Sequence, residues 1–291
     1  MRTMTPQHIA AFAVCLAAEE RAPATIAQYT RALSAFAQYL RGREVTKQAT
    51  LAYKAHLITR YSPAGVNAAL SALNRFFAYM EWHDLRVKNV KIQKQIFAPT
   101  DQELTKPEYD RLLSAAKQQK NDRLYLLMQT ICSTGIRVSE LRYITTEAVH
   151  DGVAEISGKG KRRRVFLPQQ LCRLLRRYSQ EQGIRSGAVF VTRTGRPLDR
   201  SNIWSDMKKL CRAAHVLATK VFPHNLRHLF ARTYYSAQKD IVRLADILGH
   251  ASINTTRIYT MESGDVHRRQ IQKLGLVRDW PPTTDSRGKP Q

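Results

Sequence analysis

Apolar residues recur at intervals of three and four over much of the first 95 residues, which is the spacing of one face of an α-helix. After Pro23, one such set consists of Ile26, Tyr29, Leu33, Phe36 and Leu40. Ser62 and Pro63 are an N-cap followed by proline in the first turn, a typical helix start. The apolar stripe of that helix consists of Val66, Leu70, Leu73, Phe76, Phe77 and Met80. We predict that residues 1–95 form a compact bundle of four or five short helices with the aromatic side chains in its core.

The pattern changes over residues 86–103, which lose the helical period, carry several basic residues and contain Pro99. This composition predicts a basic linker. Thr105, Pro107 and Glu108 then make a capping box with proline in the first turn, so a helix begins there. We expect a second domain over residues 104–280 and a disordered tail over 281–291.

A strand-like segment interrupts the helical pattern of the second domain. Residues 155–157 and 164–167 flank the turn sequence GKGK at 158–161, which predicts a β-hairpin. Residues 188–191 are a candidate for a further short strand. The sequence therefore predicts a mainly α fold, with a helical first domain and an α+β second domain that holds a small antiparallel sheet.

The charge of the chain indicates its partner. Among 291 residues, 47 are Lys or Arg and 23 are Asp or Glu, a formal net charge of +24. Hydrophobic residues make up 43%, enough to bury real cores, so the chain is not a disordered basic tail. A solvated basic surface is the alternative, but solubility alone needs far less charge. A polyanion, and nucleic acid first, is the expected partner.

The cysteines and the N-terminal segment indicate in which cellular compartment the protein is found. Cys15, Cys132, Cys172 and Cys211 lie far apart without a CxxC pair, which argues against a zinc ribbon and against a disulfide framework. The apolar run 9–18 has the length of a signal-peptide core, but acidic residues follow it directly, and an amphipathic first helix explains it equally well. We expect a cytoplasmic protein without a membrane segment.

Five short pieces of the second domain carry candidate chemistry. They are Arg137 within STGIRVSE, Lys159 within GKGKRRR, the pair His224 and Arg227 within HNLRH, His250 after Leu-Gly, and Tyr259 nine residues later. Taken singly, an arginine near a helix start and a basic hairpin tip are also common surface phosphate contacts. His224 and His228 have the spacing of a metal pair, but position 225 is Asn where a zinc hydrolase motif has its catalytic Glu.

These residue types suit chemistry on a phosphodiester without a metal or a cofactor. Two arginine forks can bind the non-bridging oxygens, on which negative charge develops during attack. Histidines add donors to the same charge. Tyr259 supplies a hydroxyl nucleophile, and Lys159 is suited to protonate the departing 5′ oxygen.

The segments 133–141, 157–168, 224–228 and 248–260 resemble, in order and spacing, the motifs of the tyrosine recombinases, which include phage and transposon integrases and Xer-type recombinases. The resemblance implies a SAM-like core-binding domain followed by a catalytic domain of the DNA breaking–rejoining type. It implies that Arg137 and Arg227 bind the scissile phosphate, that His224 and His250 support them, that Lys159 is the general acid and that Tyr259 is the nucleophile.

The remaining residues of these motifs have secondary expected roles. Glu140 is expected to buttress the site, and Tyr234 and Tyr235 to be core or minor-site residues rather than nucleophiles. Lys161 replaces Lys159 if the hairpin tip is shifted. We expect DNA phosphates to be contacted by four consecutive basic residues, Lys161, Arg162, Arg163 and Arg164.

The resemblance also implies partners. These are double-stranded DNA with inverted-repeat core sites, a homotetramer on two such sites that exchanges strands through a Holliday junction, and an accessory DNA-bending or excisionase protein. The chain begins at the core-binding helices, as in the simpler two-domain members. A mobile-element integrase is the preferred role and Xer-type resolution of chromosome or plasmid dimers the alternative. The alternatives from other functional classes are a type IB-like topoisomerase and a catalytically silent DNA-binding protein.

Overall fold

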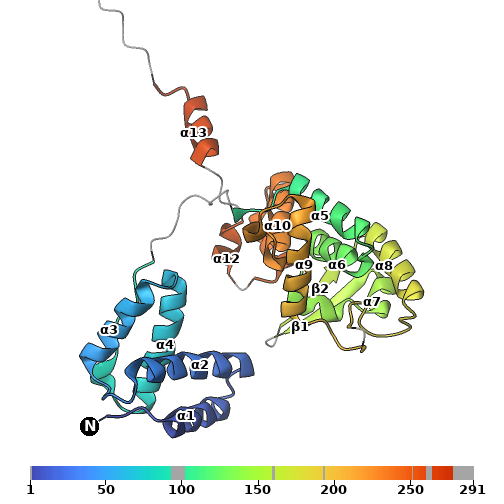
Figure 1. The fold of residues 1–291 in the computed structure, drawn as a ribbon. Coiled ribbons are helices and arrows are strands. Elements are labelled where there is room, and N and C mark those ends of the chain that lie inside the picture. The colour runs from blue at the N-terminus through green and yellow to red at the C-terminus, as the bar shows by residue number, and fades with distance from the viewer. Residues whose placement is uncertain are drawn as a thin grey trace, which may run out of the picture. The chain divides into compact units, whose positions relative to one another are not determined.

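The computed structural model describes residues 2–92, 102–158, 161–192, 194–250, 252–259 and 264–277. Lys159, residues 93–101 of the predicted linker and the predicted tail 281–291 lie outside the described residues. The chain divides into two compact units, Met1–Gln95 and Ile96–Gln291, and each is described here by itself (Figure 1).

The first unit consists of helices. They are α1 (Pro6–Ala18), α2 (Pro23–Leu40), α3 (Lys47–Ile58), α4 (Pro63–Tyr79) and the short 3₁₀ helix η1 (His83–Leu85). As predicted, Ser62 caps α4, and its hydroxyl accepts from the amide of Gly65. Thr5 caps α1, so the apolar run 9–18 belongs to an ordinary helix of this unit.

The predicted apolar faces of α2 and α4 meet in one core. Leu33, Phe36 and Leu40 from α2 are fully or almost fully buried, and so are Leu70 and Phe76 from α4. Phe12 of α1 packs edge-on against Phe76, with 5.5 Å between the ring centroids. The helical bundle predicted from the spacing is therefore confirmed.

The second unit is also mainly helical. Its elements are α5 (Lys106–Gln118), α6 (Asp122–Thr134), η3 (Val138–Tyr143), α7 (Thr146–Asp151), β1 (Val153–Gly158), β2 (Lys161–Phe166), α8 (Gln169–Glu181), α9 (Arg200–Ala214), η4 (Ala218–Lys220), α10 (Pro223–Gln238), α11 (Ile241–Leu248), α12 (Ile253–Arg257) and α13 (Gly264–Lys273). The predicted capping box of Thr105 and Glu108 begins α5. None of the described helices is both long enough and apolar enough to cross a membrane.

Helix α6 lies in the centre of the second unit and packs against α5, α8, α9 and α10. Its buried residues cover more than half of the helix circumference rather than a narrow stripe, as expected of a central helix. Because α6 ends at Thr134, directly before Arg137, the core of this unit fixes the start of the candidate site.

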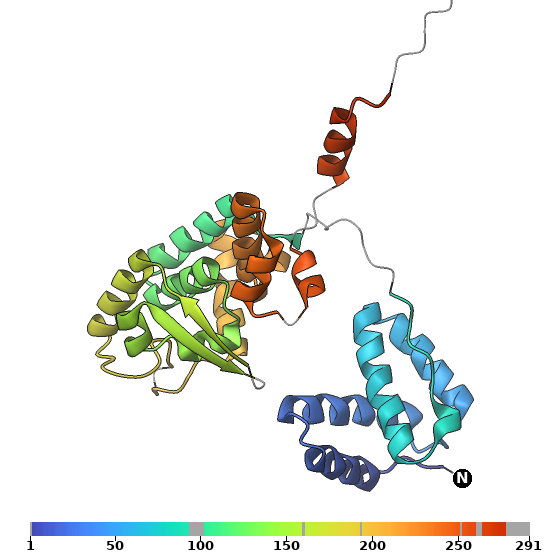
Figure 2. The same cartoon turned by 180° about the vertical axis from the view of Figure 1, so that it is seen from behind.

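The predicted hairpin is present, with Ala154 opposite Val165 and Ile156 opposite Arg163 (Figure 2). Successive side chains of a strand point to opposite faces. Ala154, Ile156 and Val165 face the core, whereas Arg162, Arg164 and Phe166 face solvent. Residues 188–191 make only isolated bridges at Ala188 and Val191, so the further strand predicted there is not formed. The mainly α fold with a small antiparallel sheet is confirmed.

Candidate active site

The segment that carries Arg137 leaves α6 through a tight turn. Gly135 ends the helix with φ +67°, a left-handed conformation that favours glycine. A Cβ at this position would lie 2.4 Å from Cδ1 of Phe230 on α10, so a side chain has no room there. Ile136 is then buried, and Arg137 is the N-cap of η3 with its side chain 42% exposed. The turn thus directs Arg137 outward beside α10.

Glu140 holds Arg137 in place. One carboxylate oxygen, Oε2, accepts from the backbone amide of Arg137 at 2.8 Å, and the other, Oε1, accepts from its Nη1 at 3.1 Å. Burial alone would raise the pKa of Glu140, but hydrogen bonds from Arg163 and Arg137 outweigh it and lower the pKa. Glu140 is therefore ionised at neutral pH and acts as the anionic partner of two arginines.

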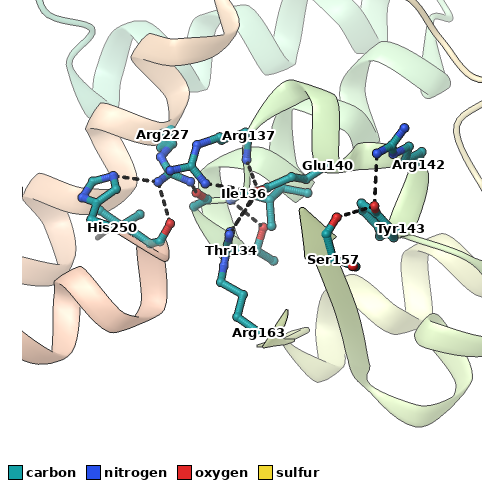
Figure 3. A network of polar contacts seen from close by, with 12 residues as sticks. Thr134, Ile136, Arg137, Glu140, Arg142, Tyr143, Ser157, Arg163, Arg227 and His250 are labelled. Atoms are coloured by element: carbon teal, nitrogen blue, oxygen red, sulfur yellow. Dashed lines mark hydrogen bonds and ion pairs between the residues drawn. The ribbon is translucent and has the colours of Figure 1, made fainter. Parts of the chain in front are cut away.

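Arg227 lies on α10 and is 1% exposed. Its Nη1 donates to the carbonyl of Gly135 at 2.5 Å, and its Nη2 donates to the carbonyl of Leu248 at 2.8 Å (Figure 3). Burial and the charge of Arg137 lower the pKa of Arg227 to about 10, which leaves it protonated at neutral pH. Its Nε is buried and has no hydrogen-bond partner among the described residues.

His250 follows Gly249, which ends α11 with φ +64°. Its Nε2 lies 2.9 Å from Nη2 of Arg227, and its Nδ1 lies 2.8 Å from the hydroxyl of Thr256. An arginine can only donate, so Nε2 is the acceptor, and Nδ1 carries the proton and donates to Thr256. Burial, followed by the charges of Arg227, Arg137 and Arg163, lowers the pKa of His250 to about 4. The imidazole is thus neutral and fixed in one tautomer at neutral pH.

Tyr259 is 4% exposed and is enclosed by histidines. Its ring stacks on His250, with 5.8 Å between the centroids and 17° between the planes, and meets His228 edge to face at 4.6 Å. Its backbone amide donates to the carbonyl of Thr256. The phenol is also near enough to Arg227 to hydrogen-bond with it, and this contact offsets part of the lowering of the Arg227 pKa.

His224 and His228 lie one turn apart on α10, with 4.5 Å between their ring centroids. Burial and the nearby arginines lower the pKa of His224, and burial together with His224 lowers that of His228 to about 3. Within the described part of the chain, no three His, Cys, Asp or Glu side chains are grouped closely enough to hold a metal ion. The contacts of this pair are with each other and with the Tyr259 ring.

The structure separates the basic run of β2 into two kinds of residue. Arg162 and Arg164 are exposed, and the Arg164 guanidinium lies over the Phe166 ring. Arg163 faces inward, is 16% exposed and gives both Nη groups to Glu140. The structure therefore gives Arg163 a different position from the DNA-contacting one that the sequence predicted. Strand alternation is the signal for this, because Arg163 shares a face with buried Val165.

The structure thus brings Arg137, Arg227, His250 and Tyr259 to one place, with His224 at its edge. Burial, followed by the charge of Arg137, lowers the pKa of Arg227, and Glu140 provides one negative charge beside the two arginines. A site with two neighbouring guanidinium groups is suited to an anion with several oxygens. Thr256, which contacts His250, was not singled out from the sequence, since neither its type nor its spacing distinguishes it from a core residue. His228 was considered only as one of a possible metal pair with His224, and its contact with the Tyr259 ring was not predicted.

Residues 102–264 match the phage integrase family. The chain belongs to this family. Among curated proteins it is 29% identical to the tyrosine recombinase XerA of Pyrococcus furiosus, over 96% of this chain and 97% of that protein. It is 30% identical to XerA of Thermococcus kodakarensis, over 91% and 94%. Members of the tyrosine recombinase family are DNA strand-transferring enzymes.

Solved structures of the family share the fold. A crystal structure of XerA recombinase is 25% identical, with a TM-score of 0.52, and covers 94% of this chain and 100% of its own. A lambda integrase dimer bound to a core site is 18% identical, with a TM-score of 0.72, covering 96% and 80%. XerH bound to its difH substrate is 21% identical, with a TM-score of 0.68, covering 95% and 85%. At these identities the likeness to the last two concerns the fold alone.

Proposed function

We propose that this protein is a site-specific recombinase that cuts and rejoins duplex DNA through a 3′-phosphotyrosine at Tyr259. The observation that carries the proposal is the Arg227–His250–Tyr259 cluster beside Arg137, in which a tyrosine hydroxyl lies next to a preformed cationic site. The membership in a family of strand-transferring enzymes supports it. The net charge of +24 supports DNA as the partner.

In the proposed reaction, the Tyr259 hydroxyl loses its proton to water, its oxygen attacks the scissile phosphorus, and the bond from phosphorus to the 5′ oxygen breaks. The guanidinium groups of Arg137 and Arg227 bind the non-bridging oxygens as their charge grows. Lys159 protonates the leaving 5′ oxygen, with Lys161 as the alternative on the same hairpin. The bond energy is kept in the phosphotyrosine, so rejoining by a 5′ hydroxyl requires neither ATP nor a metal cofactor.

The histidines have supporting roles in this reaction. In the geometry described above, His250 accepts from Arg227 and holds that guanidinium, while its ring supports the Tyr259 ring. His224, on the first turn of α10, is a further donor for the phosphate. Glu140 is a positioning residue for Arg137. Exposed Arg162 and Arg164 are proposed to bind phosphates of the DNA backbone.

The proposed assembly is a homotetramer on two DNA sites with inverted repeats, assisted by a DNA-bending or excisionase protein. The C-terminal segment supplies one feature in support. Ile271 of α13 and the following Leu274, Leu276 and Val277 are all more than half exposed. An apolar set of this kind is suited to docking on a neighbouring protomer.

Deleting residues from 265 onward is expected to impair synapsis and cleavage more than DNA binding, and unchanged recombination would contradict the docking.

Two biological roles fit this activity. One is integration and excision of a mobile element, and the other is Xer-type resolution of chromosome or plasmid dimers. The match to XerA proteins over nearly the whole of both chains favours the second. Recombination assays with a plasmid carrying two copies of the DNA that flanks the gene, compared with two copies of the chromosomal dimer-resolution site, distinguish the two roles.

Covalent trapping tests the activity. The protein is incubated without metal on DNA that flanks its gene, and an SDS-resistant protein–DNA adduct is sought. The adduct is expected with the wild type and with Tyr234→Phe, a matched phenol on α10, but not with Tyr259→Phe. Tight binding without an adduct would instead indicate a silent DNA-binding protein. Steady relaxation of any supercoiled plasmid would indicate a topoisomerase.

A further inference from the structure

Two segments that are far apart in the sequence form the phosphate side of the site. Residues 135–140 carry Arg137, and residues 248–250 carry His250. Arg227 connects them, because it donates to the Gly135 carbonyl in the first segment and contacts Leu248 and His250 in the second. The distance between Arg137 and His250 therefore depends on what holds these two segments together.

Arg163 connects the same two segments from the opposite side. Its Nη1 donates to Oε1 of Glu140 at 3.0 Å, and its Nη2 donates to Oε2 at 2.9 Å (Figure 3). Its side chain also lies directly against Gly249. A Cβ on Gly249 would be 2.7 Å from Cδ and 2.8 Å from Nη1 of Arg163. The Arg163 guanidinium thus lies between the two segments, bonded to one and packed on the backbone of the other.

The fork of Arg163 and the binding of Arg137 depend on the same carboxylate. Each oxygen of Glu140 accepts one hydrogen bond from Arg163 and one from Arg137. A carboxylate held by a planar fork cannot rotate without breaking two charge-assisted hydrogen bonds. The orientation of Glu140 is therefore set by β2, and the orientation of Arg137 by Glu140.

We propose that Arg163 is a positioning residue, which aligns Arg137 through Glu140 with the Gly249–His250 turn, and that it does not bind DNA. This inference rests on the proposed function, since alignment of the two segments matters for attack on a phosphate. It divides the run Arg162–Arg164 by function: the outer residues bind DNA, and the inner one prepares the active site. A misplacement of about 1 Å in an active site can slow a reaction by about a hundredfold.

The test separates binding from chemistry. Wild-type protein and the variant Arg163→Gln are compared on a nicked DNA substrate that traps the covalent intermediate. The single-turnover rate of adduct formation is measured at saturating DNA, and Kd is measured separately. Arg163→Gln is expected to slow adduct formation by about ten- to a hundredfold, with Kd changed by less than about twofold. Arg164→Gln is expected to weaken binding and to lower the salt slope by about one.

Two further variants serve as controls for a loss of rate that is caused only by misfolding. Arg163→Lys keeps a positive charge beside Glu140, so the fold is expected to persist. Because one ammonium cannot reproduce the planar fork, the rate of adduct formation is expected to fall at least about tenfold. Arg177→Gln removes an exposed arginine whose pairing with Glu181 lies within α8, and both rate and Kd are expected to stay unchanged. All rates are measured at temperatures where thermal unfolding shows each variant to be folded.

The outcomes distinguish the inference from the function on which it rests. If the wild type forms the adduct and either Arg163 variant matches its rate, the positioning role is refuted while the recombinase remains. If Arg163→Gln instead loses affinity and salt slope like Arg164→Gln, Arg163 is a DNA contact. If the wild type forms no adduct, the proposed function fails, and this inference fails with it.

Discussion

Gly135→Ala is expected to destabilise the second unit and to disturb the active site together. Gly135 has φ +67°, and a Cβ there would lie 2.4 and 2.6 Å from two ring atoms of Phe230 and 3.0 Å from Leu248. Phe230 is on α10, one turn after Arg227, and the Gly135 carbonyl accepts from Arg227. A methyl group at this position must therefore push α10 or α11 away from the end of α6.

Gly152→Ala is the matched control, because Gly152 has φ +71° and also ends a helix but has nothing within 4 Å of the site of a Cβ. Left-handed backbone costs an alanine roughly 1–2 kcal/mol at both positions. Overpacking adds about 1–3 kcal/mol at Gly135 only. The difference between the two variants is thus about 1–3 kcal/mol, or a melting temperature lower by about 3–9 °C for a unit of this size.

This difference is measured by calorimetry of the whole chain, in which the transition of the second unit is followed separately. The trapping assay measures the accompanying loss of cleavage. Equal melting temperatures for the two variants would refute the close approach of α6, α10 and α11 at Gly135. A lower melting temperature with unchanged cleavage, at temperatures where the variant is folded, would show that Arg227 does not depend on this turn.

Three other perturbations test separate parts of the site. Thr256→Val removes the acceptor of the His250 Nδ1 proton and is expected to slow adduct formation about tenfold at unchanged DNA affinity, whereas Thr255→Val, at an exposed position, is expected to have no effect. His250 and His228 have pKa values of about 4 and about 3, below the usual 6.5, so the folded state favours their neutral forms. The stability that they contribute is present above pH 6.5 and is lost as the pH falls from 6.5 toward 4. Over this pH range, the melting temperature of the His228→Asn variant is expected to fall less steeply than that of the wild type. DNA affinity is expected to fall by orders of magnitude between roughly 50 and 200 mM salt, and a flat response in a filter-binding titration would contradict binding through phosphates.

Much of the fold could be predicted from local patterns. The three-and-four spacing of apolar residues identified α2 and α4, and the capping box at Thr105 identified the start of α5. These features depend on residues within a turn or two of each other, so sequence shows them directly. The strand predicted at 188–191 is absent because that segment finds only isolated bridge partners at Thr145 and Pro197. Strand formation depends on such a distant partner.

The sequence alone determined the class of chemistry. The charge of +24, together with arginines, histidines and a tyrosine in an ordered set of motifs, pointed to a phosphodiester and a phenol nucleophile. Residue types decide which atoms can donate, accept or attack, and these properties do not depend on the fold. The order of the motifs along the chain was sufficient for the resemblance, and the match to the family confirmed it.

Only the tertiary structure decided which members of a similar set face the site and which support it. Arg162, Arg163 and Arg164 are alike in sequence, but Arg163 alone reaches Glu140 and Gly249. Thr255 and Thr256 are adjacent, but only Thr256 is buried and accepts the Nδ1 proton of His250. These distinctions arise where segments separated by tens or hundreds of residues come within hydrogen-bond distance. No local pattern carries that information, because it is a property of the packed core that brings the segments together.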